Sequence, residues 1–175
     1  MEMQLNIQKT VFDDKKVQKN LLKIDKEKGD KLMYIYNVMK TLIEYASRSN
    51  DIPVAAAVVK DGRIISIKRN DSKKAIYHAE ILAIIDATSK LSTKDLRSCE
   101  MFVTKEPCPM CMSAIVLSKV KRLYFGARDF KMGAAESCFN LSQHPFLNHK
   151  VEVIGGICED ECRLLLKRFF EEKRR

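Results

Sequence analysis

The chain has 175 residues, 46% of them hydrophobic, and a formal net charge of +9. This length suits one domain around a single packed core, and no apolar run approaches the roughly 18 residues that a membrane-spanning helix needs. The first residues have neither the apolar core nor the cleavage site of a signal peptide, so we expect a soluble, cytoplasmic protein that makes no membrane contact. The excess of basic residues favours a polyanionic partner, above all nucleic acid.

Residues 1–30 mix lysine with acidic residues and lack a sustained apolar period. We expect them to form an N-terminal arm, flexible or loosely attached, ahead of a domain that spans residues 31–175. Apolar residues then recur at helical spacing between 31 and 49 and predict a first amphipathic helix. Two apolar runs joined by Asp61-Gly62 follow and predict a β-hairpin, because both turn residues tolerate positive φ.

Strand and helix patterns alternate over the rest of the chain. Strands are predicted at 100–104, 120–126 and 151–156, and helices at 79–90, 109–119 and 158–172. Together with the first helix and the hairpin, this order predicts an α/β fold, namely a three-layer α/β/α sandwich with a central mixed five-stranded sheet.

The stretch EPCPMC places Cys108 and Cys111 three residues apart at the expected start of a helix. Residues at i and i+3 share one face of a helix, so both thiols can point at one metal ion. Pro109 suits the first helical turn, where its missing N–H is not needed, and the helix dipole there favours thiolates. Taken alone, the two cysteines are equally compatible with a redox pair or with plain buried thiols.

His78 opens another predicted helix, in the stretch AIYHAEIL. One histidine and two cysteines make three protein ligands, the number found at a catalytic zinc whose fourth position is free for water. Glu80 would lie near that metal without binding it, where a carboxylate can take a proton from the activated water and return it to a leaving group. This combined pattern is the signature of zinc-dependent nucleobase deaminases, whereas an isolated His-x-Glu would indicate a helix-start histidine and a solvated glutamate.

From DIPVAAAVVKDG onward, over roughly residues 32–172, the sequence resembles the bacterial tRNA-specific adenosine deaminases of the cytidine deaminase-like superfamily. HAEILAI and EPCPMC are shared with nucleobase deaminases generally, including guanine deaminases. RLYFGARDFKMGAAES and HPFLNHKVEVIGG resemble segments that distinguish the tRNA enzymes. The resemblance implies hydrolysis of adenosine to inosine at the wobble position of a tRNA anticodon.

The same resemblance implies roles for individual residues. His78, Cys108 and Cys111 would bind one Zn²⁺ per subunit, and Glu80 would be the catalytic proton shuttle.

Three further residues are implied to contact the substrate. Asn70 would hydrogen-bond the flipped nucleoside, the backbone amide of Ala79 would orient the purine, and Asp129 would touch the RNA backbone near the target base. Asn70 is also compatible with a simple turn residue, and Asp129 with a residue that caps the next segment. The loop DSKKAIY before His78 is shorter than is usual in the family, and Glu136 replaces a glycine.

Residues 163–175 hold six basic side chains against two acidic ones, and the corresponding helix end in the resembled family faces the anticodon stem. We therefore expect the basic C-terminal residues to contact RNA phosphates, unless this segment is only a solvated helix end. The candidates are Lys167, Arg168, Lys173 and Arg174.

The resemblance also implies a homodimer that binds a tRNA anticodon stem-loop. Two other functions remain compatible with the motifs. One is a deaminase of free nucleobases or nucleosides, of the guanine or cytosine type, which would not need a basic surface. The other is a catalytically inactive RNA-binding scaffold with a structural zinc, against which the presence of Glu80 argues.

Overall fold

The computed structural model describes residues 30–174. Apart from its last residue, the predicted N-terminal arm lies outside the described residues. The strands are β1 (Ala55–Lys60), β2 (Arg63–Arg69), β3 (Cys99–Lys105), β4 (Arg122–Ala127) and β5 (Glu152–Ile154). The helices are α2 (Asp30–Ser47), α3 (Ala79–Leu91), α4 (Pro109–Leu117) and α5 (Glu159–Glu172), together with the short 3-10 helix η1 (Leu141–Gln143).

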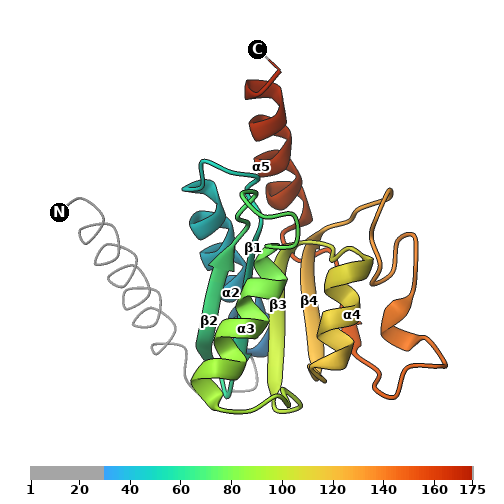
Figure 1. Cartoon of the computed structure of the whole chain (residues 1–175). Coiled ribbons are helices and arrows are strands. Elements are labelled where there is room, and N and C mark those ends of the chain that lie inside the picture. Colours follow the sequence, from blue (N-terminus) through green and yellow to red (C-terminus); the bar gives the residue numbers. More distant parts are fainter. Residues whose placement is uncertain (1–29, 175) are drawn as a thin grey trace.

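The five strands form one sheet in the order β2-β1-β3-β4-β5. β1 is antiparallel to both β2 and β3, whereas β3, β4 and β5 run parallel to one another. Helices α3 and α4 cover one face of this sheet, and α2 and α5 lie against the other (Figure 1). The predicted three-layer sandwich with a mixed five-stranded sheet is confirmed.

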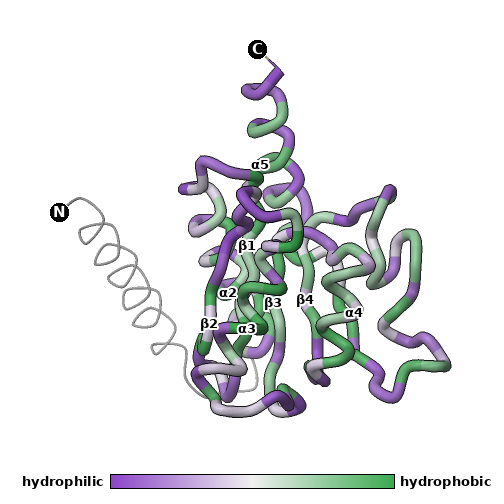
Figure 2. The backbone as a smooth tube through the Cα atoms, viewed as in Figure 1, coloured by the Kyte–Doolittle hydropathy of each residue, from purple (hydrophilic) through white to green (hydrophobic). Residues whose placement is uncertain are grey.

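Alternate residues of β1 point to opposite faces of the sheet, as the pleat requires. Ala56 and Val58 belong to the hydrophobic core under α3 and α4, whereas Ala57 and Val59 belong to the core under α2 and α5. Figure 2 shows hydrophobic residues concentrated in β1, β3 and β4, while the C-terminal tip of α5 is hydrophilic. The small side chains of β1 thus allow helices to pack closely on both sides of the central strands.

The predicted boundaries agree with the structure to within two residues, and two of the differences have a clear cause in the backbone. The helix expected to reach residue 119 ends at Leu117, because Lys119 has a left-handed backbone with φ 62° and cannot continue the helix. The strand expected at 151–156 is limited to Glu152–Ile154, since Gly156 turns the chain with φ 82°. Both differences lie away from His78, Glu80, Cys108 and Cys111 in the sequence.

The carboxyl ends of the parallel strands β3 and β4 meet at one edge of the sheet, where α/β folds place their binding sites. The two segments with metal-ligand motifs, His78 before α3 and Cys108 before α4, start their helices beside this edge. Among the helices between residues 30 and 174, none combines the length and apolar character that crossing a membrane requires.

Candidate metal centre and active site

His78 and Cys108 are the N-cap residues of α3 and α4, and Cys111 follows within the first turn of α4. Both caps have extended backbones, with ψ 151° for His78 and 171° for Cys108, so each side chain leaves its helix at the open amino end. The ligand atoms of these three residues lie within 4.8 Å of one another. The structure therefore brings the three predicted ligands together from motifs that are separated in the sequence.

The spacing of these atoms suits a tetrahedral zinc ion. His78 Nδ1 is 3.7 Å from Cys108 Sγ and 3.4 Å from Cys111 Sγ. Usual Zn–S and Zn–N bond lengths at a tetrahedral angle place nitrogen and sulfur ligands about 3.6 Å apart. One nitrogen and two sulfurs are also typical zinc donors, so the residues present fit this ion.

The pKa values of the two thiols are shifted in opposite directions. The pKa of Cys108 is lowered to about 5, because its sulfur accepts hydrogen bonds from the thiol and the backbone N–H of Cys111 and lies beside His78. The pKa of Cys111 is raised by that same bond to Cys108, by burial and by the nearby Glu80. Without a metal, Cys108 is therefore the more readily ionised of the two thiols.

Glu80 lies in the first turn of α3 and is only 4% exposed. Burial raises the pKa of its carboxyl group, because the surroundings solvate the charged form poorly. It lines the same cavity as His78 and Cys108. A carboxyl group so close to the ligand set, and so shielded from bulk water, is suited to exchange protons with a molecule bound there.

The cavity has a volume of about 190 Å³. Its apolar wall comes from Ile52, Val54, Leu166 and Phe170, and its polar wall from Asn70, His78, Glu80, Lys105, Glu106 and Cys108. A cavity of about 150 Å³ can hold one benzene ring, so this space accommodates a flat nucleobase rather than a whole nucleotide. A base with an attached sugar and phosphates would leave those groups at the mouth.

Asn70 and Ala79 contact each other in this structure. The backbone N–H of Ala79 donates a hydrogen bond of 2.9 Å to Asn70 Oδ1. With its oxygen used in this way, Asn70 keeps its Nδ2 amino group as a donor for a ligand in the cavity that it lines. The role predicted for the Ala79 amide stays a prediction, and it requires that amide to be shared with or released by Asn70.

Glu106 was not among the residues predicted for the site, although it comes directly before the Pro-Cys motif. It is 2% exposed, and its oxygens accept hydrogen bonds from the backbone amides of Asp129, Glu136 and Ser137, each of 2.9 Å. The Ser137 hydroxyl donates a further bond of 2.5 Å. Burial alone would raise the pKa of Glu106, but these bonds outweigh it and lower the pKa. Glu106 thus anchors the segment 128–137 against the cavity.

Asp129 lies at the start of this segment and ion-pairs with Lys105. Its Oδ1 accepts hydrogen bonds from the backbone amides of Lys131 at 2.9 Å and Met132 at 3.2 Å, which is the capping arrangement considered as its alternative role. Glu136, the residue that replaces a glycine, forms an ion pair of 3.1 Å with Arg128. Its added negative charge is therefore partly neutralised within the segment.

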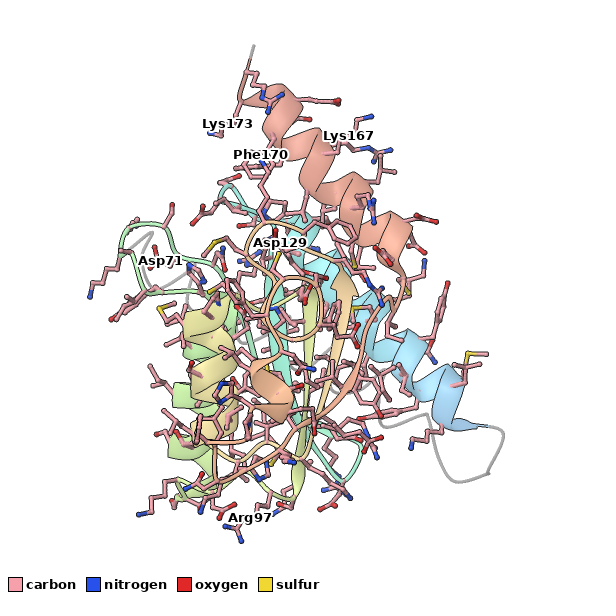
Figure 3. All side chains as sticks on the ribbon, turned by 90° about the vertical axis from the view of Figure 1, so that its right-hand side faces the viewer. Asp71, Arg97, Asp129, Lys167, Phe170 and Lys173 are labelled. Carbon is pink, nitrogen blue, oxygen red and sulfur yellow. The ribbon has the colours of Figure 1, made fainter. Side chains whose placement is uncertain are left out.

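A second, more open cavity of about 580 Å³ shares Ile52, Asn70 and Phe170 with the first. Lys173 lines it, with its Nζ 5.8 Å from the centre of the Phe169 ring. Figure 3 shows Phe170 and Lys173 on α5 at the same end of the molecule as Asp129 and Asp71, and Arg97 at the opposite end. The predicted basic helix end therefore lies beside the cavities.

The other basic candidates near the C-terminus do not line the cavities. Lys167 has a side chain 67% exposed and approaches Glu171 at 3.8 Å, and Arg168 and Arg174 are also exposed. The residues that line the two cavities, within the described part of the chain, include Lys173 but not these three.

The fold and the ligand geometry define the class of this protein. A family model described as MafB19-like deaminase matches residues 30–174, which is the whole described range. The protein therefore belongs to this deaminase family, in agreement with the class of enzyme that the metal-ligand motifs predicted.

Curated relatives narrow this class. The tRNA-specific adenosine deaminase of Bacillus subtilis (strain 168) is 39% identical over 143 residues, covering 78% of this chain and 89% of the relative. That of Aquifex aeolicus (strain VF5) is 40% identical over 144 residues, covering 81% of this chain and 95% of the relative. The chain belongs to the family of tRNA-specific adenosine deaminases, which confirms the resemblance seen in the sequence.

Solved structures agree with this assignment. A structure from work on A-to-I editing by tRNA:A34 deaminases matches with a TM-score of 0.70 and 32% identity, over 77% of this chain and 99% of that chain. A mutant of the protein NE0047 in complex with 8-azaguanine matches with a TM-score of 0.68 and 26% identity, over 77% and 84% of the two chains.

Proposed function

We propose that the protein hydrolyses adenosine to inosine at the wobble position of a tRNA anticodon. The observation that carries this proposal is the cavity lined by His78, Cys108 and the buried Glu80, with Cys111 close to both ligand residues, in a chain whose relatives are named tRNA-specific adenosine deaminases. The reaction adds the oxygen of water to C6 of the adenine and breaks the C6–N bond, so inosine and ammonia are the products.

One Zn²⁺ per subunit is the cofactor that this donor set fits, held by His78, Cys108 and Cys111. When bound, zinc supplies a water molecule of lowered pKa at neutral pH. His78 and Cys108 are fixed as helix caps and Cys111 is buried, so the chain itself determines where that water stands relative to a base in the cavity.

Glu80 is the proton carrier in this proposal. Its carboxylate takes a proton from the attacking water and delivers it to the departing amino group. Its position in the first turn of α3, two residues after His78, places it beside the ligands while keeping it out of bulk solvent. A positioned acid and base of this kind contributes roughly 100 to 10,000-fold to a rate.

Asn70 and the apolar wall hold the flipped base in the cavity. Asn70 Nδ2 donates to an acceptor on the nucleoside, while Ile52, Val54, Leu166 and Phe170 exclude water around the ring. The rest of the anticodon stem-loop lies outside, towards Asp129 and the basic candidates of α5. These are Lys167, Arg168, Lys173 and Arg174, whose positive charge suits RNA phosphates.

We further propose that the protein acts in the cytoplasm as a homodimer. Helix α4 supports the dimer, since it exposes Met110 by 36% and Leu117 by 71% beside buried residues of the core. Exposed side chains of this size are what a subunit interface covers. Light scattering at micromolar concentration should give the mass of two chains, and a monomer would contradict this part of the proposal.

Deamination of a free purine base is the second candidate, because a relative of known structure binds 8-azaguanine at 26% identity. The cavity alone suits a base equally well. What favours RNA is the identity to the tRNA enzymes, with the net charge of +9 and basic residues near the cavity mouth.

One assay separates these functions. The purified zinc-loaded protein is incubated with an anticodon stem-loop that carries adenosine at the wobble position, and in parallel with free adenosine, adenine, guanine and cytosine. We expect inosine in the stem-loop alone, formed at least about 100-fold more slowly with Glu80→Gln. Turnover of free guanine without turnover of the stem-loop would replace the proposal by the second candidate.

A further inference from the structure

Lys105 is the last residue of β3 and lines the cavity together with Asn70 and Glu80. None of the sequence motifs marks it as functional. Its ammonium group ion-pairs with the carboxylate of Asp129, the second residue of the 128–137 segment that follows β4. The side chains of Lys105 and Asp129 are 34% and 14% exposed, so the pair lies partly open to solvent. The ammonium group of Lys105 therefore lies where the sugar and phosphates of a bound substrate would leave the cavity.

The surroundings fix Asp129 more firmly than they fix Lys105. Asp129 Oδ1 is held by two backbone amides of its own segment, and its backbone N–H donates to the buried Glu106 at 2.9 Å. Burial would raise the pKa of Asp129, but the bond to Lys105 and those amides outweigh it and lower the pKa, so Asp129 is ionised at neutral pH. An anion that is already bonded in this way is poorly suited to meet a phosphate directly.

Lysine has three N–H donors on its ammonium group. Among the described residues, the bond to Asp129 is the hydrogen bond that Lys105 Nζ makes. Two donors are therefore left for a ligand, and they are already oriented, because Asp129 restricts the long lysine side chain. A phosphate can bind without breaking the ion pair.

We propose that Lys105 binds a phosphate of the RNA strand next to the flipped adenosine, and that Asp129 is the positioning residue that holds Lys105 there. This inference rests on the proposed function, because it requires an RNA substrate. It also reassigns Asp129, which acts on the RNA backbone through Lys105 rather than by touching it.

The chain offers a matched control at the opposite end of the sheet. Lys119 has the same exposed fraction as Lys105, 34%, and pairs with Asp95 at 3.8 Å. Asp95 also pairs with Arg97, which Figure 3 places at the end of the molecule away from Asp129. Lys105→Met and Lys119→Met thus remove the same charge and the same kind of ion pair, but only one of them lies at the cavity.

The test is a salt titration of stem-loop binding, measured by fluorescence anisotropy with the parent, both methionine variants and Lys105→Arg. Each carries Glu80→Gln so that the RNA is not converted. We expect Lys105→Met to weaken binding about tenfold and to flatten the slope of log K against log salt by about 0.7, the value for one phosphate of a single strand. Lys119→Met and Lys105→Arg should keep the parent slope.

A second arm identifies the phosphate. Stem-loops with a single uncharged methylphosphonate linkage, placed on either side of the target adenosine, should bind the parent more weakly at one of the two positions. The same linkage should weaken binding no further with Lys105→Met, because the lysine that would bind this phosphate is already absent. A circular dichroism melt, with a shift in Tm of about 4 °C or less for Lys105→Met, separates weaker binding from a damaged fold.

The outcomes separate this inference from the proposed function. If the active parent binds and converts the stem-loop while Lys105→Met behaves like Lys119→Met, Lys105 does not contact RNA and the ion pair only holds the segment. If the active parent neither binds nor converts the stem-loop, the proposed function is wrong and the inference is overturned with it.

Discussion

At the base of the cavity, His78 and Cys108 cap two helices whose inner faces pack in the hydrophobic core, whereas at its rim the basic side chains sit on the exposed end of α5. At the base, the two helix caps hold the ligand atoms at the spacing that a metal ion needs. At the rim, Lys173 is exposed, with its Nζ 5.8 Å from the centre of the Phe169 ring. Catalysis requires the reacting groups to be held in a fixed geometry, whereas attraction to RNA phosphates requires only positive charge close to the RNA. We therefore expect changes at the base to act on turnover and changes at the rim to act on affinity.

The largest expected effect is at the ligands. Cys108→Ser should reduce the metal content from about one zinc per chain to nearly none, because a hydroxyl is a poor replacement for a zinc-bound thiolate. Turnover should be lost with the metal. Elemental analysis of the purified variant checks this result, with Cys138→Ser, an exposed cysteine outside the ligand group, as the matched control. Full zinc content in Cys108→Ser would exclude it as a ligand.

Glu80→Gln should keep the zinc, the fold and RNA binding but lower kcat by roughly 100 to 10,000-fold or more, because the amide cannot carry the proton. Single-turnover rates on the wobble-adenosine stem-loop measure the loss, with zinc content determined on the same sample. Near-normal turnover with full zinc would mean that this buried carboxyl group is structural.

Gly133→Ala tests the contact by which Glu106 holds the segment 128–137 against the cavity. An added Cβ would lie 2.4 Å from Glu106 Oε2 and 2.5 Å from the carbonyl oxygen of Asp129, so the segment around it must move. We expect a loss of about 1–3 kcal/mol in the free energy of unfolding and weaker RNA binding. Denaturant unfolding and anisotropy measure the two effects.

Gly62→Ala provides the control for that variant. Gly62 lies in the turn between β1 and β2 with φ 73° and has open space around its Cα. Its replacement should destabilise the fold through the backbone alone, by about 1–2 kcal/mol, and leave RNA affinity unchanged. If Gly133→Ala likewise left affinity unchanged, the 128–137 segment would not contribute to RNA binding.

The smallest expected effect is at the rim. A chain that ends at Phe170 lacks Lys173 and Arg174 and should bind the stem-loop several-fold more weakly, with a salt slope flatter by roughly one unit for each phosphate that is no longer bound. kcat at saturating RNA should be unchanged. Equal affinity and slope in the truncated and full chains would show that the helix end is only solvated and that the phosphates bind elsewhere.

The sequence predicted the sheet, its helices and the meeting of His78, Cys108 and Cys111, because each leaves a local pattern: alternating or helical apolar spacing, and cysteines three residues apart. Glu106 opens the EPCPMC motif, but no local pattern predicts its hydrogen-bond partners. Its partners Asp129, Glu136 and Ser137 lie more than twenty residues further along the chain, and only the parallel pairing of β3 with β4 brings them together. The ion pair of Lys105 with Asp129 depends on the same pairing, so it too required the folded structure.

The antiparallel pairing of β1 with β3 also makes the site dependent on a contact between distant parts of the chain. Ala56 pairs with Val103 across a long stretch of chain that includes β2 and α3, so this contact requires the closure of a large loop. His78 and Cys108 approach each other only when α3 and α4 have packed on the sheet that this pairing creates. An ion held by both residues would therefore bind only the folded chain, and it would stabilise the native state relative to the unfolded one.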